Sequence, residues 1–181
     1  INLRPRRSEQ DYSTDDKRLL QNLATQAAPA LRIAQLAQQQ QAEARQRERI
    51  EQELRVARVI QETLLPKEIP ELTDWGLAAH WQPATEVSGD FYDFVHFPDG
   101  RLAVIIADVT DKGVPAAMVM ATTRSILRAA AEMLIEPGKV LARTNELLHP
   151  DIPAKMFVTC LYMVIEPGSG KVVLANAGHN L

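Results

Sequence analysis

Acidic residues gather in the stretch SGDFYDFVHFPDGRLAVIIADVTDKG, residues 88–113. Asp90 and Asp93 lie at the start of one apolar run, and Asp108 lies at the end of the next. Carboxylates at the edge of a core repel one another and lose hydration, so they are best tolerated when a cation lies between them. The stretch offers only oxygen ligands, which suit Mg²⁺ or Mn²⁺ better than zinc. The alternative is that these are ordinary strand-end carboxylates in water.

A hairpin would bring two of these carboxylates together. Residues 91–97 and 101–107 are predicted as strands joined by "PDG", a turn in which Pro sets one backbone angle and Gly supplies a positive one. If the strands pair across this turn, Asp90 and Asp108 lie at the same end of the hairpin. Asp93 lies further along the first strand, where its side chain can face the other side of the sheet.

The chain beyond Leu65 predicts further short strands and two helices. "WGLAAHWQ" alternates loosely as a strand, and Pro115 suits the first turn of a helix over residues 116–134. A second helix is predicted over residues 138–149. "MFVTCLYMVIE" and "KVVLANAG" are predicted as strands joined by the turn "PGSG". Two strands, two helices and two strands in this order predict an α/β layered sandwich rather than alternating parallel units.

The first third of the chain has a helical pattern. Ser13, followed by Asp16 three residues later, is typical of a capped helix start, and Pro29 predicts a kink or a helix boundary. Two series of residues spaced alternately by four and three predict a weak coiled-coil seam with a change of register near residues 45–49. The series are Leu23, Ala27, Ala30, Ala34, Ala37, Gln41 and Ala44, and Ile50, Leu54, Ala57, Gln61 and Leu64. We interpret the seam as pairing with a second copy; the alternative is a solvated linker helix in a monomer.

Composition limits the possible classes of protein. The 181 residues are 46% hydrophobic and 24% charged, and the net charge of −3 gives no general electrostatic case for binding nucleic acid or an anionic membrane. Cys160 is the only cysteine, which excludes an intrachain disulfide and favours a reducing, cytoplasmic location. No apolar run is long enough to span a bilayer. Because the chain starts with Ile1 and stops directly after a strand-like segment, we expect both ends to be cut from a longer protein.

Three motifs occur in the order "SGDFYDF", "ADVTDKGVPAAMVMA" and "NAGHN". Together they resemble the bacterial branch of the PPM-type metal-dependent serine/threonine protein phosphatases, which includes the sporulation and sigma-factor-regulating phosphatases. The resemblance implies a layered α-β-β-α sandwich, incomplete at its C-terminus, over residues 66–181. A linker helix or coiled coil over residues 41–65 would precede it. Residues 1–40 resemble the closing strand and helix of a GAF sensor domain.

The resemblance also implies roles for individual residues. Asp90 matches the acidic residue of the family's first motif, Asp108 matches its metal-bridging aspartate, and the backbone carbonyl of Val109 matches a further ligand. In the family these groups hold two Mn²⁺ or Mg²⁺ ions that activate a water for in-line attack on a phosphoserine or phosphothreonine. Asp93 and Asp111 are candidates for carboxylates that surround these ligands. Two further aspartates of the family would lie beyond residue 181.

Several positions depart from the family pattern or have an ordinary interpretation. Many relatives have Ser-Gly where this chain has Thr110 and Asp111, and nothing replaces the histidine that the eukaryotic branch has at the position of Thr110. We expect His179 of "NAGHN" to make a hydrogen bond that fixes a loop rather than to take part in catalysis. Arg124 and Arg128 are expected to be ordinary exposed arginines of a helix.

The resemblance implies a phosphatase of a bacterial partner-switching pathway, regulated through an N-terminal sensor and a helical linker. Its substrate would be a phosphorylated regulatory protein such as an anti-sigma-factor antagonist, and it would act as a homodimer without a nucleic-acid or membrane partner. One alternative is a catalytically idle, phosphatase-like signalling or scaffold module that acts by dimerisation and partner binding. Another is a dimerising helical connector whose sandwich binds a partner. The intact Asp90 and Asp108 argue against the first, and their spacing argues against the second.

Overall fold

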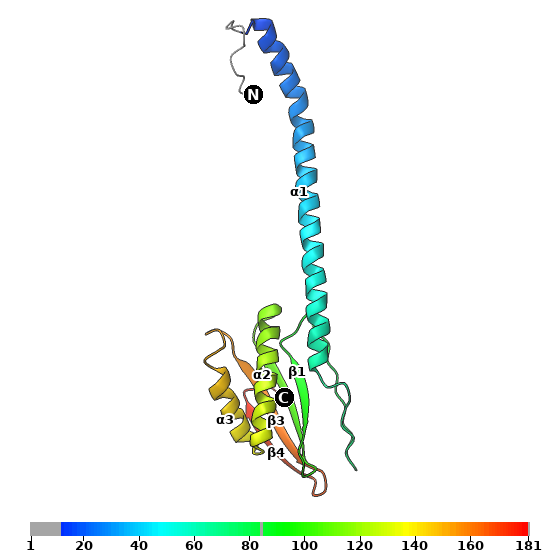
Figure 1. The fold of residues 1–181 in the computed structure, drawn as a ribbon, viewed down its shortest axis with the longest axis vertical. Helices are drawn as coiled ribbons and strands as arrows, with labels where there is room; N and C mark the ends of the chain where they lie inside the picture. Colours follow the sequence, from blue (N-terminus) through cyan, green and yellow to red (C-terminus); the bar gives the residue numbers. More distant parts are fainter. Residues whose placement is uncertain (1–11, 84, 181) are drawn as a thin grey trace. The chain divides into compact units, whose positions relative to one another are not determined.

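The computed structural model describes residues 12–83 and 85–180 (Figure 1). The chain divides into two compact units, Ile1–Gln52 and Glu53–Leu181. None of the helices in the described residues combines the length and the apolar character needed to cross a membrane. The elements in chain order are α1 (Thr14–Leu64), β1 (Phe91–His96), β2 (Leu102–Val109), α2 (Val114–Met133), α3 (Pro137–Leu148), β3 (Val158–Glu166) and β4 (Lys171–Ala177).

The four strands form one antiparallel sheet in the order β1-β2-β3-β4. Both predicted hairpins are confirmed. In the first turn Phe97 N donates to Arg101 O at 2.9 Å, and Gly100 has the positive φ of 86° that the "PDG" sequence predicts. Phe91 pairs with Ala107, so the next residue outward on each strand lies at the same end of the hairpin. The strand pairing thus places Asp90 and Asp108 at one end of the sheet.

Helices α2 and α3 lie side by side on one face of the sheet (Figure 1). Both helices were predicted, and Pro115 occupies the first turn of α2 as expected. Alternate strand residues point to this helical layer and form the hydrophobic core. Its largest fully buried side chains include Phe91, Ile105, Met120, Leu127 and Tyr162. Cys160 also lies in this core, where burial raises the pKa of its thiol to about 12, so it is an inert thiol.

The opposite face of the sheet carries no helix in the described part of the chain. Ile106 is 43% exposed there and Leu174 is 57% exposed. The segment 77–82 lies against this face and encloses with it a cavity of about 560 Å³. The strand that we predicted for residues 75–82 is therefore wrong: apart from a single bridge between Leu72 and Trp75, the segment forms no ladder. Its alternating side chains pack on the face of the sheet instead of on a neighbouring strand.

The predicted fold class is confirmed as an α/β fold with an antiparallel sheet and a long N-terminal helix. The described residues form one helical layer and one sheet of the predicted sandwich.

Helix α1 begins with the predicted cap. Asp16 N donates to Ser13 Oγ and Ser13 N donates to Asp16 Oδ2, each at 3.1 Å, which is the reciprocal pattern of a capping box. The predicted helix boundary at Pro29 is wrong, because α1 continues through it. A proline removes one backbone hydrogen bond and costs about 3 kcal/mol, which the rest of a 51-residue helix can outweigh. Residues 14–40 belong to α1, and residues 1–11 of the predicted GAF end lie outside the described residues.

Candidate metal-binding site

Asp90 and Asp108 lie side by side at the open end of the β1–β2 hairpin. Both are exposed, and both line a cavity of about 280 Å³ together with Val109, Asp111 and the segment 85–89. The pKa of Asp90 is raised from 3.8 to about 6, first because the protein excludes water from the carboxyl and second because Asp108 lies beside it. The two adjacent carboxylates repel each other, and a cation bound between them would relieve this repulsion.

The backbone of Asp90 is held from two directions. Asp90 N donates to Ser88 Oγ at 3.1 Å, and Trp81 Nε1 donates to Asp90 O at 2.8 Å. Ser88 in turn exchanges two hydrogen bonds with the side chain of Gln61. Neither Gln61 nor Trp81 was predicted to support the site. The available signal was a glutamine at an otherwise apolar position of the second heptad series.

Gly89 lets the Asp90 segment approach the end of β2. A Cβ atom at Gly89 would lie 2.8 Å from Val109 O and 3.0 Å from Val109 Cβ, both closer than normal contacts. Only glycine therefore fits between Ser88 and Asp90. The carbonyl oxygen of Val109, which we predicted as a ligand, consequently lies next to the segment that carries Asp90.

The loop after β2 is tied to the start of β3 through Thr110. Thr110 N donates to Phe157 O at 3.0 Å, and Phe157 N donates to Thr110 Oγ1 at 2.9 Å. Asp111 follows with a positive φ of 78°, in the left-handed region that glycine adopts without strain. Its carboxylate accepts a hydrogen bond from Lys112 N at 2.9 Å. Asp111 thus lines the cavity while its backbone adopts a left-handed conformation that glycine favours.

Replacing Asp111 by glycine should leave stability unchanged or raise it by about 1 kcal/mol. The left-handed strain disappears, and the greater freedom of glycine in the unfolded state offsets part of that gain. Asp111→Ala should instead cost about 1 kcal/mol, because alanine keeps the strain and loses the acceptor for Lys112 N. Urea unfolding of the two variants and the parent checks this. A larger loss in Asp111→Gly than in Asp111→Ala would contradict it.

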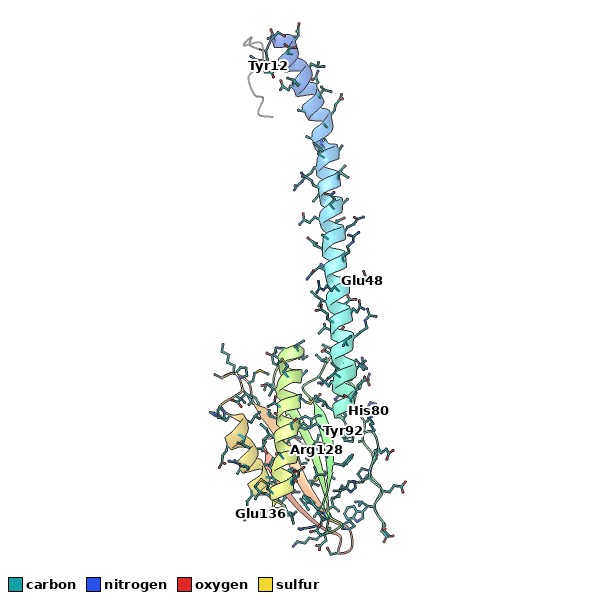
Figure 2. All side chains as sticks on the ribbon, in the orientation of Figure 1. Tyr12, Glu48, His80, Tyr92, Arg128 and Glu136 are labelled. Carbon is teal, nitrogen blue, oxygen red and sulfur yellow. The ribbon has the colours of Figure 1, made fainter. Side chains whose placement is uncertain are left out.

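Asp93 lies outside this site, contrary to our expectation that it could surround the metal ligands. It is 1% exposed and faces α2. Its carboxylate accepts from Arg128 Nη1 at 2.9 and 3.0 Å, and Arg124 Nε lies 3.0 Å from Asp93 Oδ2. Arg128 belongs to α2 (Figure 2). The expectation of ordinary exposed arginines was therefore also wrong for Arg124 and Arg128. The strand alternates, so Asp93 shares the helix-facing side with Phe91 while Tyr92 faces the other way.

His179 makes the loop-fixing hydrogen bonds that we expected. Its backbone N donates to Asn176 Oδ1 at 2.7 Å, Asn176 Nδ2 donates to His179 O at 2.9 Å, and its Nδ1 lies 2.9 Å from Thr159 Oγ1. The charge of His179 lowers the pKa of Asp90 and so partly offsets the rise described above. The "NAGHN" motif therefore places the His179 ring near Asp90, although none of the residues that line the cavity of about 280 Å³ belongs to this motif.

The metal-free protein should lose stability through Asp90 as the pH rises. The folded-state pKa of about 6 lies above the ordinary 3.8, so the folded state holds the proton more tightly than the unfolded state. This contribution is fully present below the ordinary pKa and is lost as the pH rises through about 6. Urea unfolding in EDTA from about pH 4 to about pH 7 should show the parent losing stability relative to Asp90→Asn. Parallel pH profiles of the two proteins would contradict the shift.

The described residues supply part of a ligand set for a hard cation. The carboxylates of Asp90 and Asp108 and the nearby Val109 carbonyl are oxygen donors of the type that Mg²⁺ and Mn²⁺ prefer. Within residues 12–83 and 85–180, no three His, Cys, Asp or Glu side chains lie close enough together to hold a metal ion. The donor chemistry of the two carboxylates and the carbonyl fits such an ion.

Comparisons with known proteins give consistent results. Residues 98–181 match the family model of stage II sporulation protein E (SpoIIE). The chain is 33% identical over 156 residues to the protein IcfG of Synechocystis, covering 70% of this chain and 24% of IcfG. It is 32% identical over 130 residues to the phosphoserine phosphatase RsbU of Bacillus subtilis, covering 72% of this chain and 38% of RsbU. The chain thus spans less than two fifths of the length of these relatives.

A solved structure has the same fold. The SiaA-PP2C domain of Pseudomonas aeruginosa superposes with a TM-score of 0.61 at 21% identity, over 72% of this chain and 55% of that one. At this identity the similarity establishes the fold.

Proposed function

We propose that the protein is a metal-dependent serine/threonine protein phosphatase of bacterial signalling, because residues 98–181 match the SpoIIE family model and the chain shares the fold of a solved PP2C domain. The observation that carries the proposal is the pairing of Asp90 with Asp108 at the open end of the hairpin, beside the Val109 carbonyl. The similarity to a phosphoserine phosphatase supports the same activity.

The proposed substrate is a phosphoserine or phosphothreonine on a regulatory protein, such as an anti-sigma-factor antagonist in the cytoplasm. Asp90 and Asp108 are exposed, so a phosphorylated side chain of another protein can reach them. A small-molecule phosphatase would more commonly enclose its substrate in a deep pocket. The exposed position of the two carboxylates therefore favours a macromolecular substrate.

The chain's own residues would bind and orient the metal ions. Asp90, Asp108 and the Val109 carbonyl would hold Mn²⁺ or Mg²⁺, and Gly89 keeps the two segments close enough to do so together. When bound, two such ions lower the pKa of a water and neutralise charge on the phosphoryl oxygens. The hydroxyl of Thr110 is engaged by the backbone of Phe157, so this side chain is not positioned as a proton donor.

The test is hydrolysis of a generic phosphate ester and of a phosphoserine peptide with Mn²⁺. The assay uses the full-length protein, because the chain spans only 24% of IcfG and 38% of RsbU. Turnover that requires Mn²⁺ and stops in EDTA is the expected result. A folded full-length protein that neither binds Mn²⁺ nor turns over would favour the idle signalling module instead.

We also propose that α1 pairs with a second copy of the chain and transmits a signal from an N-terminal sensor. The seam is exposed in a single chain, with Leu23 at 54% and Ile50 at 46% exposure. Sedimentation of the full-length protein should therefore give the mass of a dimer. Replacing Ala34 and Ala37 together by Leu should strengthen the first register of the seam and change the regulated activity. A monomer at micromolar concentration would rule out the pairing.

A further inference from the structure

Gln61 is the one residue of α1 that is buried among the described residues. It lies in the last turn of the helix and is 4% exposed. Its amide makes two hydrogen bonds to one backbone position: Gln61 Nε2 donates to Ser88 O at 2.6 Å, and Ser88 N donates to Gln61 Oε1 at 2.9 Å. The side chain therefore pairs with Ser88 as a neighbouring strand would.

Ser88, the partner of Gln61, is also hydrogen-bonded to Asp90, the proposed metal ligand. Ser88 is itself 9% exposed, and its hydroxyl accepts the hydrogen bond from Asp90 N at 3.1 Å. Gly89, between them, lies against Val109. Two consecutive hydrogen-bonded steps thus join the end of α1 to the backbone of Asp90.

The residue type at position 61 is best explained by this contact. The heptad series Ile50, Leu54, Ala57, Gln61 and Leu64 would accept an apolar side chain here, and an apolar residue would strengthen the seam. A buried amide without partners costs about 1–3 kcal/mol, so Gln61 is favourable only while Ser88 is docked against it. If the end of α1 moves, both Gln61 and the backbone of Ser88 lose their partners together. The two hydrogen bonds are therefore kept or lost together.

We propose that Gln61 is a positioning residue that couples the last turn of α1 to the Asp90 carboxylate. In the docked arrangement Ser88 is fixed at both its N–H and its C=O, and Asp90 is held beside Asp108. In the separated arrangement the segment 87–90 is released, and the two carboxylates no longer share one metal site. This inference rests on the proposed function for its effect on activity, while the coupling itself is a property of the fold.

The first experiment measures the coupling without reference to catalysis. Deuterium uptake of the segment 86–92 is compared in the full-length parent, in Gln61→Met and in Gln52→Met. Methionine matches glutamine in length and lacks both hydrogen bonds, and Gln52 is an exposed glutamine of the same helix. We expect faster exchange about Asp90 in Gln61→Met alone. Unchanged uptake in a folded Gln61→Met protein would overturn the coupling.

The second experiment measures metal binding and turnover. Mn²⁺ affinity, followed by the electron paramagnetic resonance signal of free Mn²⁺, should fall about 10- to 100-fold in Gln61→Met, as is typical when a residue supporting a ligand is lost. Ser88→Ala, which removes only the acceptor for Asp90 N, should weaken Mn²⁺ binding less. The effects of the two substitutions should be less than additive, because both act through one chain of hydrogen bonds.

The outcomes separate the two proposals. The proposed function would be refuted, and the coupling left intact, if Gln61→Met exchanges faster than the parent about Asp90 while the parent neither binds Mn²⁺ nor hydrolyses the phosphate ester. A parent that is active, with Gln61→Met matching it in Mn²⁺ affinity and kcat to within about twofold, would overturn the inference and leave the function. If Gln61→Met does not fold, Ser88→Ala decides: unchanged Mn²⁺ affinity and unchanged exchange at Asp90 would overturn the inference.

Discussion

Asp108→Asn in the full-length protein should lower Mn²⁺-dependent turnover by about 100-fold or more, because loss of even a residue that merely supports a metal ligand typically costs 10- to 100-fold. Asparagine has nearly the same shape but carries no charge, and Asp108 lies beside Asp90 at the centre of the proposed site. The substitution should not unfold the protein. Asp108 is exposed, and the hydrogen bond from Thr159 Oγ1 reaches its backbone oxygen, which asparagine retains.

Initial rates at saturating Mn²⁺, with circular dichroism to verify folding, measure this effect. Asp151→Asn is a suitable control, since it removes one exposed carboxylate after α3 and lies outside the cavity that Asp108 lines. Its rate should equal that of the parent. Retention of more than about a tenth of the parent rate in Asp108→Asn would show that this carboxylate is not a metal ligand.

Asp93→Ala should lower the free energy of unfolding by about 3–5 kcal/mol, the usual cost of removing one partner from a buried ion pair. Asp93 is 1% exposed and forms ion pairs with two arginines of α2, of which Arg124 is only 16% exposed. Arg128, at 43% exposure, can turn to water, whereas Arg124 would keep its charge in a largely apolar environment. The substitution therefore leaves an uncompensated cation between β1 and α2.

Urea unfolding followed by circular dichroism measures this loss. The exposed pair between Asp99 and Arg101 provides the matched control, because Asp99→Ala removes a carboxylate from a solvated pair and should leave the free energy of unfolding nearly unchanged. Replacing Asp93, Arg124 and Arg128 together by apolar residues should recover most of the stability, since no charge is then left unpaired. Equal losses in Asp93→Ala and Asp99→Ala would contradict the buried network.

Much of the hairpin that carries the site could be predicted because its signals are local. "PDG" specifies the turn, and the alternating apolar residues on either side specify which strand residues face the core. Together they set the pairing of Phe91 with Ala107 and hence the position of Asp90 opposite Asp108. The helix cap at Ser13 and the helix after Pro115 were predictable for the same reason, since each depends on residues within one turn.

The errors concern features that depend on distant partners. Residues 75–82 alternate like a strand, yet alternation states only that one side is buried, and here the burying surface is the face of the sheet. Pro29 predicts a kink or a boundary because propensity is local, whereas the continuity of α1 depends on the whole helix.

The sequence by itself determined the two hairpins, the register of the first hairpin and the pairing of Asp90 with Asp108, because turn chemistry and side-chain alternation act between near neighbours. The pairing of β2 with β3, which lie about fifty residues apart in the chain, was decided by the tertiary structure. Only the tertiary structure decided the roles of Asp93 and Gln61. Their partners lie on other elements, with Arg128 35 residues and Ser88 27 residues away. A buried carboxylate or amide is stable only where packing brings it a complementary group, and no local pattern specifies which group that will be.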